Sequence, residues 1–64
     1  MILNNIAEIR KKKGLTIRQL EYKTGISKST LSRLENNEMK LYLELLEKIA
    51  RALNCNVQDL FDIV

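Results

Sequence analysis

The chain has 64 residues, 45% of them hydrophobic and 30% charged, and carries a net charge of +3 at pH 7. This length allows one domain, residues 1–64, whose small core needs regular helix packing or a partner subunit. One cysteine, no histidine and no carboxylate cluster exclude an internal disulfide and argue against a zinc site or a hydrolase triad, so we expect no metal, no cofactor and no enzyme activity.

The N-terminal segment predicts a short helix. Asn5, followed three residues later by Glu8, has the pattern of a capping box, so we expect the helix to begin near Asn5. The lysines at 11–13 suit its negative C-terminal end, where they are either solvated or in contact with DNA phosphates, and Gly14 ends the helix. Met1-Ile2-Leu3 is too short for a signal peptide, and no apolar run approaches the ~20 residues of a membrane span. We therefore expect a cytoplasmic protein with no membrane contact.

Two short helices joined by a tight turn at Gly25 are predicted for residues 17–24 and 28–36. Thr16 and Ser27 precede them, and each hydroxyl can accept a hydrogen bond from an unpaired N–H group of a first helical turn. A glycine adopts the left-handed conformation that lets a helix stop sharply. This arrangement is a helix-turn-helix.

The second of these helices has two different faces. Leu31 and Leu34 lie on its apolar face. The opposite face carries cationic, hydroxyl and amide side chains and no acid: Lys28, Ser29, Ser32, Arg33 and Asn36. A small, positive, hydroxyl-rich surface fits the major groove of DNA, and Lys28 and Arg33 can donate paired hydrogen bonds to guanine. The alternative is a solvated amphipathic helix in an interaction module.

Charge along the chain supports an anionic partner. Residues 1–40 contain nine Lys and Arg against four acids, a balance of +5, whereas residues 41–64 contain two against four, a balance of −2. The basic part coincides with the helix-turn-helix, so nucleic acid is the expected partner. Glu35 is an acid close to this surface. We expect it to turn away and form a structural ion pair with Arg10; the alternative is two ordinary surface charges.

The C-terminal part predicts a loop and two further helices. Asn37 can take a left-handed conformation in the loop at 36–40, and a helix follows from Leu41 or Tyr42 to Leu53. Its predicted inward face comprises Leu43, Leu46, Ile49, Ala50 and Leu53. Three apolar residues are surplus to that face and form a candidate dimer contact: Leu41, Tyr42 and Leu45.

The end of the chain predicts a last short helix, followed by a terminal segment for which two structures are possible. Asn56, with Asp59 three residues on, is a capping box for the helix, in which Val57, Leu60 and Phe61 close the core. Residues 62–64 are either a frayed tail or a strand beside residues 1–3. Cys55, between the last two helices, is predicted to be a small buried hydrophobe.

Several motifs together resemble the phage-repressor (Cro and cI-like) helix-turn-helix family, also called the XRE family. They are Gly14-Leu15-Thr16, Leu20, Thr24-Gly25-Ile26-Ser27, the run from Ser29 to Asn36, Leu43-Glu44 and the run from Ile49 to Asn54. The resemblance covers about residues 6–61. It implies a compact all-α domain of five helices whose third helix enters the major groove, usually as a symmetric dimer on a palindromic operator.

The resemblance also assigns roles to individual residues. Base-reading positions of the family match Ser27, Lys28, Ser29 and Arg33, with Ser32 beside them. Positions near phosphates match Thr16, Arg18 and Asn36, and the paired ion positions match Arg10 and Glu35.

Three positions depart from the family pattern. Ile17 stands where many members have a glutamine that helps fix the backbone contact. Glu21 replaces a small residue, usually alanine, that lets the second helix pack closely on the third, so the angle between them is open to change. Asn37 replaces a common glycine, which the backbone tolerates.

The sequence thus predicts a sequence-specific DNA-binding transcription regulator, most simply a repressor that binds a palindromic operator as a homodimer. The alternative is a small protein-binding module of the same fold, such as an antitoxin or anti-repressor, that holds another protein through Leu41, Tyr42 and Leu45.

Overall fold

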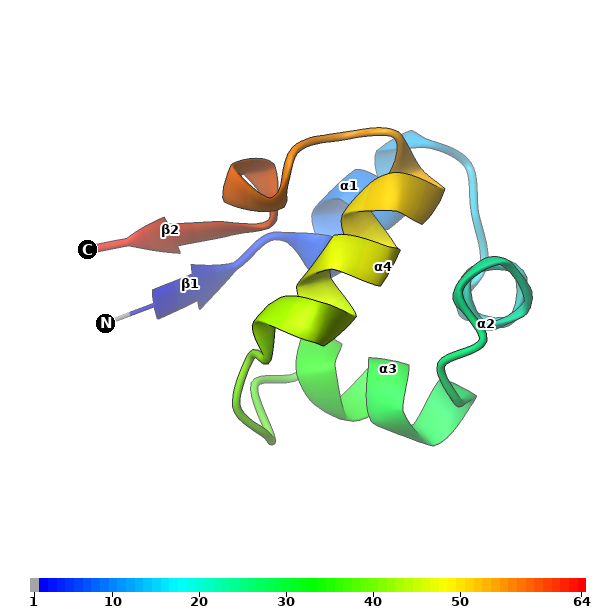
Figure 1. Cartoon of the computed structure of the whole chain (residues 1–64), viewed down its shortest axis with the longest axis horizontal. Coiled ribbons are helices and arrows are strands. Elements are labelled where there is room, and N and C mark those ends of the chain that lie inside the picture. The colour runs from blue at the N-terminus through cyan, green and yellow to red at the C-terminus, as the bar shows by residue number, and fades with distance from the viewer. Residues whose placement is uncertain (1) are drawn as a thin grey trace.

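The computed structural model describes residues 2–64, and in that range the chain forms four α-helices, one 3-10 helix and two short strands. Their order is β1 (Ile2–Asn4), α1 (Ile6–Lys12), α2 (Ile17–Thr24), α3 (Lys28–Glu35), α4 (Leu43–Leu53), η1 (Val57–Leu60) and β2 (Phe61–Ile63). In Figure 1, α4 crosses in front of α1, α3 lies along the lower edge, and α2 is seen end-on at the right. The predicted mostly helical fold is confirmed. The predicted count of five α-helices is wrong, because the last helix is a single 3-10 turn.

The two ends of the chain pair as an antiparallel ribbon. Ile2 lies opposite Ile63, and Asn4 lies opposite Phe61. The ribbon projects from the end of the molecule opposite α2 (Figure 1). Of the two alternatives for the terminal segment, the strand is therefore correct, although Met1 lies outside the described residues. Phe61 opens the strand instead of extending the last helix, which explains why η1 stops at Leu60.

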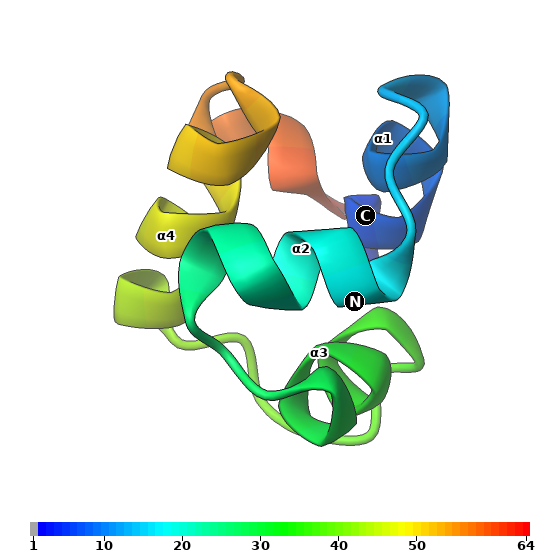
Figure 2. The same ribbon diagram turned by 90° about the vertical axis from the view of Figure 1, so that its right-hand side faces the viewer.

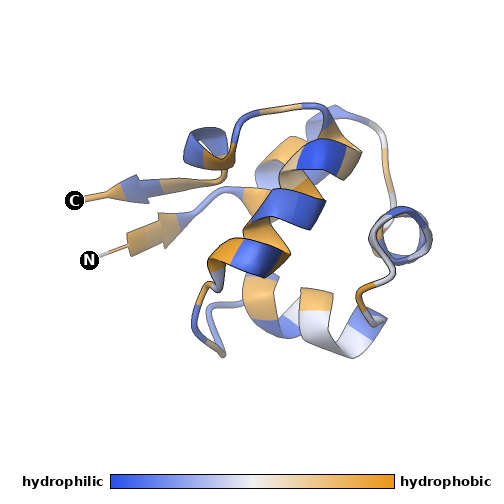
Figure 3. Cartoon of the chain, viewed as in Figure 1, coloured by the Kyte–Doolittle hydropathy of each residue, from blue (hydrophilic) through white to orange (hydrophobic). Residues whose placement is uncertain are grey.

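The core is built from apolar side chains of every helix. Side chains with no exposed surface come from α1, α2, α3, α4 and η1: Ile6, Leu20, Leu31, Leu34, Ile49 and Leu60. Figure 3 shows the hydrophilic residues of α4 on the side that faces away from α1. Because Leu31 and Leu34 are both buried, the opposite face of α3 is left for solvent, as its amphipathic pattern predicts.

The start of α1 differs from the prediction. No side-chain hydrogen bond from Asn5 caps the helix, so the predicted Asn5–Glu8 capping box is wrong. Asn4 Oδ1 accepts the hydrogen bond from Ile6 N instead, at 2.8 Å. The Asn5 amide turns to the C-terminal strand and donates to Asp62 Oδ2 at 3.0 Å. A partner 57 residues away thus replaces the local one.

The first turn of α4 also differs from its periodicity. Leu43, predicted to face inward, is 63% exposed, and the helix begins only at this residue. Leu41 and Leu45, predicted to be surplus, are half-buried and pack against the core. Met39 packs there too, so Met39 and Leu41, from the loop before α4, cover this end of the core together with Leu45 of the helix. Tyr42 remains exposed at 54%. Helical periodicity could not predict that Met39 and Leu41 cover the core, because these residues lie in a loop and a loop has no regular period.

Candidate nucleic-acid interface

Local hydrogen bonds define the turn between α2 and α3. Thr16 Oγ1 accepts from Gln19 N at 3.1 Å, and Gln19 Oε1 accepts from Thr16 N at 2.8 Å, which is a complete capping box. Gly25 ends α2 with φ +75°, and Ser27 Oγ accepts from Thr30 N at 3.2 Å at the start of α3. The predicted caps and the left-handed glycine are confirmed. Figures 1 and 2 show α2 crossing α3 at a steep angle.

The exposed face of α3 presents cations that its own chain does not neutralise. Lys28, Ser29 and Arg33 are exposed, and Ser32 is half-buried beside them. Within residues 2–64, neither Lys28 nor Arg33 forms a side-chain hydrogen bond or an ion pair. Both side chains are therefore available to an external anion or hydrogen-bond acceptor.

Further polar residues flank this face at the ends of the helices. Thr16 precedes α2 and Arg18 lies in its first turn; both are exposed. Arg18 lines a shallow groove on the outer side of α2, together with Tyr22 and Lys23. Asn36 follows α3 and is also exposed, and its side-chain amide makes only a long contact of 3.5 Å to Ser32 Oγ.

An ion pair joins α3 to α1 behind this face. Arg10 Nε donates to Glu35 Oε2 at 2.7 Å, and Arg10 Nη2 donates to Glu35 Oε1 at 3.1 Å. The side chains are only 12% and 8% exposed, and the third guanidinium contact is with Leu15 O at 2.9 Å. This two-bond geometry is among the strongest that a carboxylate makes. Because Glu35 is engaged here, its negative charge is directed away from the exposed face of α3.

A second acidic residue reaches α3 from α2. Glu21 Oε2 accepts a hydrogen bond from the backbone N of Lys28 at 2.9 Å. Sequence reasoning noted Glu21 only as a replacement for a small residue and missed this role. The signal that could have revealed it is an acid placed seven residues before the first residue of the next helix, across a glycine turn. A polar contact thus links α2 to α3 in addition to their packing.

The remaining candidates do not form a site. Burial raises the pKa of the Cys55 thiol, the Asp59 carboxylate raises this pKa further and Lys13 lowers it, so the thiol stays protonated and weakly nucleophilic at neutral pH. Cys55, predicted to be a small buried hydrophobe, is half-buried and packs against the core. Within residues 2–64, no three His, Cys, Asp or Glu side chains gather where they could hold a metal ion. None of the helices in this range has the length and apolar character required to span a membrane.

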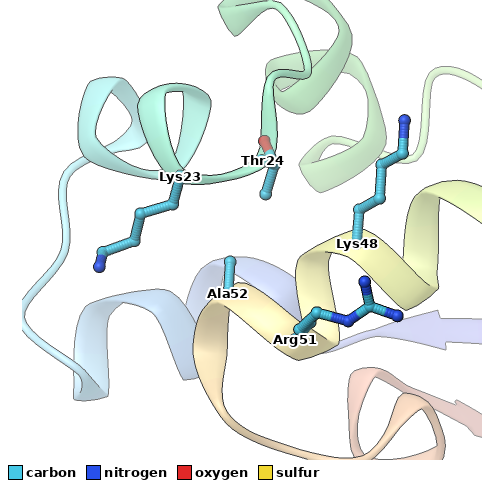
Figure 4. Close-up of a pocket in the computed structure, with 5 residues that line it drawn as sticks. All are labelled: Lys23, Thr24, Lys48, Arg51 and Ala52. Atoms are coloured by element: carbon cyan, nitrogen blue, oxygen red, sulfur yellow. The ribbon is translucent and has the colours of Figure 1, made fainter.

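A basic hollow of about 510 Å³ lies between α2 and α4. It is lined by Lys23, Thr24, Lys48, Arg51 and Ala52. Figure 4 shows its three cationic side chains pointing in different directions, so they do not converge on one ligand atom. The Thr24 hydroxyl already donates to Leu20 O at 2.8 Å. The hollow therefore adds positive charge to the surface without forming a closed binding site.

Comparisons with known proteins agree with this geometry. Residues 5–64 match the family described as the Cro/C1-type HTH DNA-binding domain. The chain is 36% identical over 63 residues to the HTH-type transcriptional regulator SinR of Bacillus subtilis, covering 97% of this chain and 57% of SinR. It is 40% identical over 53 residues to the competence pilus inhibition repressor of Acinetobacter baylyi, covering 83% of this chain and 48% of that protein. The chain thus spans about half the length of these relatives.

A solved structure supports the fold independently. The crystal structure of a proposed DNA-binding protein from Bacteroides fragilis matches with a TM-score of 0.87 and 34% sequence identity. The match covers 97% of this chain and 100% of that chain. Sequence and structure comparisons therefore identify the same type of domain as the motifs do.

Proposed function

The chain belongs to the Cro/C1-type helix-turn-helix DNA-binding domain family, and on this premise we propose that it is a sequence-specific transcription regulator that places α3 in the major groove of DNA. The observation that carries the proposal is the free face of α3: Lys28 and Arg33 are exposed and unpaired within the described residues. Membership of a family of DNA-binding domains also agrees with the expectation that the chain is not an enzyme. A regulator of this kind would act on chromosomal DNA in the cytoplasm.

The side chains of α3 divide between reading bases and holding the helix in place. Lys28 and Arg33 can donate to guanine O6 and N7, while Ser29 and Ser32 can reach adjacent base edges directly or through water. Ser27 has a more restricted role. Its hydroxyl donates to Thr30 Oγ1 at 2.9 Å while accepting from Thr30 N, so Ser27 can accept from DNA but has no proton left to donate.

Backbone phosphates would be held at the flanks of the helix-turn-helix. Thr16 and Arg18 at the start of α2, and Asn36 after α3, are exposed at the positions expected for such contacts. The lysines at 11–13 are exposed as well and add positive charge at the end of α1. Phosphate contacts of this kind position a protein on the duplex without reading its sequence.

We further propose that the protein acts as a repressor, bound as a homodimer to a palindromic operator. The name of the Acinetobacter baylyi relative supports the first point. For the dimer, the exposed side chain of Tyr42, next to exposed Leu43, offers an apolar contact, whereas Leu41 and Leu45 would contribute only their remaining surface. Two half-sites one helical turn apart require the two α3 helices of the dimer to lie about 34 Å apart.

Selection from a random pool of DNA duplexes would test this function most directly. The expected result is an enriched sequence with two-fold symmetric half-sites. Its affinity should fall steeply with salt, by about 0.9 logarithmic units per tenfold increase in salt concentration for each phosphate neutralised. Enrichment of a single half-site would contradict the proposed homodimer and still support the DNA-binding function. No enrichment, together with salt-insensitive binding of a protein through the surface around Tyr42, would support the protein-binding alternative instead.

A further inference from the structure

We propose that Glu21 is a positioning residue of the DNA-binding site, which fixes the start of α3 and restrains binding to DNA of arbitrary sequence. This inference rests on the proposed function, because it concerns how α3 meets the groove. It concerns a residue of α2 that has no place among the predicted DNA contacts. The proposal follows from the hydrogen bonds around the first turn of α3.

The carboxylate of Glu21 is committed to a backbone amide. Its Oε2 lies 2.9 Å from Lys28 N, and the side chain is half-buried between the two helices. Within residues 2–64, the ion pairs are Arg10–Glu35 and Lys12–Glu8, so no cationic side chain neutralises Glu21. A carboxylate at the positive end of a helix is favourable, and a hydrogen bond to a charged acceptor is stronger than one to a neutral acceptor.

This bond leaves the side chain of Lys28 free while holding its backbone. The Lys28 amide bonds to Glu21 and the Thr30 amide bonds to Ser27, so Ser29 has the one amide of the first turn without a partner in the described chain. The lysine that we expect to read a base is thus held at its backbone, while its ammonium group has no partner in the described chain. Glu21 joins α2 to α3 across the glycine turn, in addition to the packing of Leu20 and Leu31 in the core.

The same carboxylate has an electrostatic effect on DNA binding. It places an unneutralised negative charge beside the residue that enters the groove, and this charge repels phosphates whatever the base sequence. Its two effects therefore differ in kind. The charge lowers affinity for all DNA, whereas the hydrogen bond keeps α3 in one position and so preserves discrimination between sequences.

Two substitutions separate the charge from the hydrogen bond. Glu21→Gln removes the charge and keeps an oxygen that can accept from Lys28 N, whereas Glu21→Ala removes both. The probes are the duplex selected from the random pool and a scrambled duplex of the same composition. The matched control is Glu47→Gln, which removes one exposed acid from α4.

At low salt, Glu21→Gln should bind both duplexes about tenfold more tightly, with an unchanged ratio between them. Glu21→Ala should also bind the scrambled duplex more tightly, but the ratio should fall by about tenfold, the worth of one base contact. Glu47→Gln should change either affinity by less than about twofold. An unchanged ratio in Glu21→Ala, or a fall of the same size in Glu21→Gln, would overturn the positioning role.

Hydrogen exchange without DNA provides a second measurement. The Lys28 amide should exchange about fivefold faster in Glu21→Ala and remain protected in Glu21→Gln. Equal exchange rates of the Lys28 amide in wild type and Glu21→Ala would overturn the positioning role of this hydrogen bond, even if DNA binding is intact. Conversely, a wild-type protein that does not prefer the selected duplex would overturn the proposed function, while the exchange measurement would still report on the bond.

Discussion

The helix-turn-helix and the paired termini of this protein are held by contacts of different range. In α2 and α3 the caps lie within three residues of the amides that they satisfy, as in Thr16 with Gln19 and Ser27 with Thr30. At the termini, Asn5 instead donates to Asp62, 57 residues away. The difference teaches that the helix-turn-helix is specified largely by neighbours in sequence, while the paired termini exist only after the chain has folded.

The strongest disruption of the helix-turn-helix should come from its core. Leu31→Ala removes a fully buried side chain of α3 and should lower the free energy of unfolding by about 3 kcal/mol, most of the stability expected for a domain of this size. The matched control is Leu43→Ala, which truncates a side chain that is 63% exposed and should cost less than about 0.5 kcal/mol. Urea denaturation followed by circular dichroism measures both. Equal losses of unfolding free energy in the two variants would mean that Leu43, and not the loop before α4, covers the core at the start of that helix.

An effect of similar size is expected from the ion pair between α1 and α3, which is a long-range contact within the DNA-binding half. Arg10→Ala should destabilise the fold by about 3 kcal/mol, because Glu35 is left as a nearly buried charge without a partner. The double variant Arg10→Met with Glu35→Leu should recover most of this loss.

Lys12→Ala is the control, since the Lys12–Glu8 pair is 74% and 64% exposed and should contribute less than about 0.5 kcal/mol. A double variant as unstable as Arg10→Ala would indicate that the side chain of Arg10 matters chiefly through its contact with Leu15 O.

Arg33→Ala should affect binding without affecting the fold. The side chain is exposed and has no partner in residues 2–64, so the free energy of unfolding should change by less than about 0.5 kcal/mol. Binding to the selected duplex should weaken by about 1 to 3 kcal/mol, with relaxed preference at one base pair. Equal losses on the selected duplex and on random DNA would place Arg33 among the phosphate contacts.

The smallest effects compare a local cap with a long-range one. Thr16→Ala removes the capping box of α2 and should cost about 1 kcal/mol. Asn5→Ala removes an exposed bond to Asp62 and should cost about 0.5 kcal/mol. Hydrogen exchange at single residues would locate the damage: in α2 for Thr16→Ala, and in the terminal ribbon for Asn5→Ala. Loss of protection in both regions for either variant would show that the two units unfold together.

Much of the candidate site could be predicted because its determinants are local. Hydroxyl caps, the glycine turn and the spacing of Leu31 and Leu34 act within one or two helical turns, so the sequence predicts the amphipathic α3 and the side chains that it exposes. The pairing of Arg10 with Glu35 was also predicted, although it spans 25 residues, because an acid at the end of a DNA-facing helix needs a cationic partner.

The incorrect predictions share a physical cause. The predictions for Asn5, Leu43 and the last helix each follow from a helical pattern, and in each case residues outside that helix provide a better partner or better cover. Asp62 competes for the Asn5 amide, Met39 and Leu41 cover the core in place of Leu43, and the pairing of β2 with β1 stops η1 after one turn.

What the sequence determined by itself is therefore the helix-turn-helix, its exposed basic face and the family to which it belongs. Only the tertiary structure decided which polar group meets the first amide of α3, how loop residues close the core beneath α4, and how the termini pair. Periodicity and caps depend on the spacing of residues along one helix. Partners across a turn or between the two ends of the chain depend instead on how the helices pack, and packing minimises exposed apolar surface and unpaired polar groups over the whole molecule.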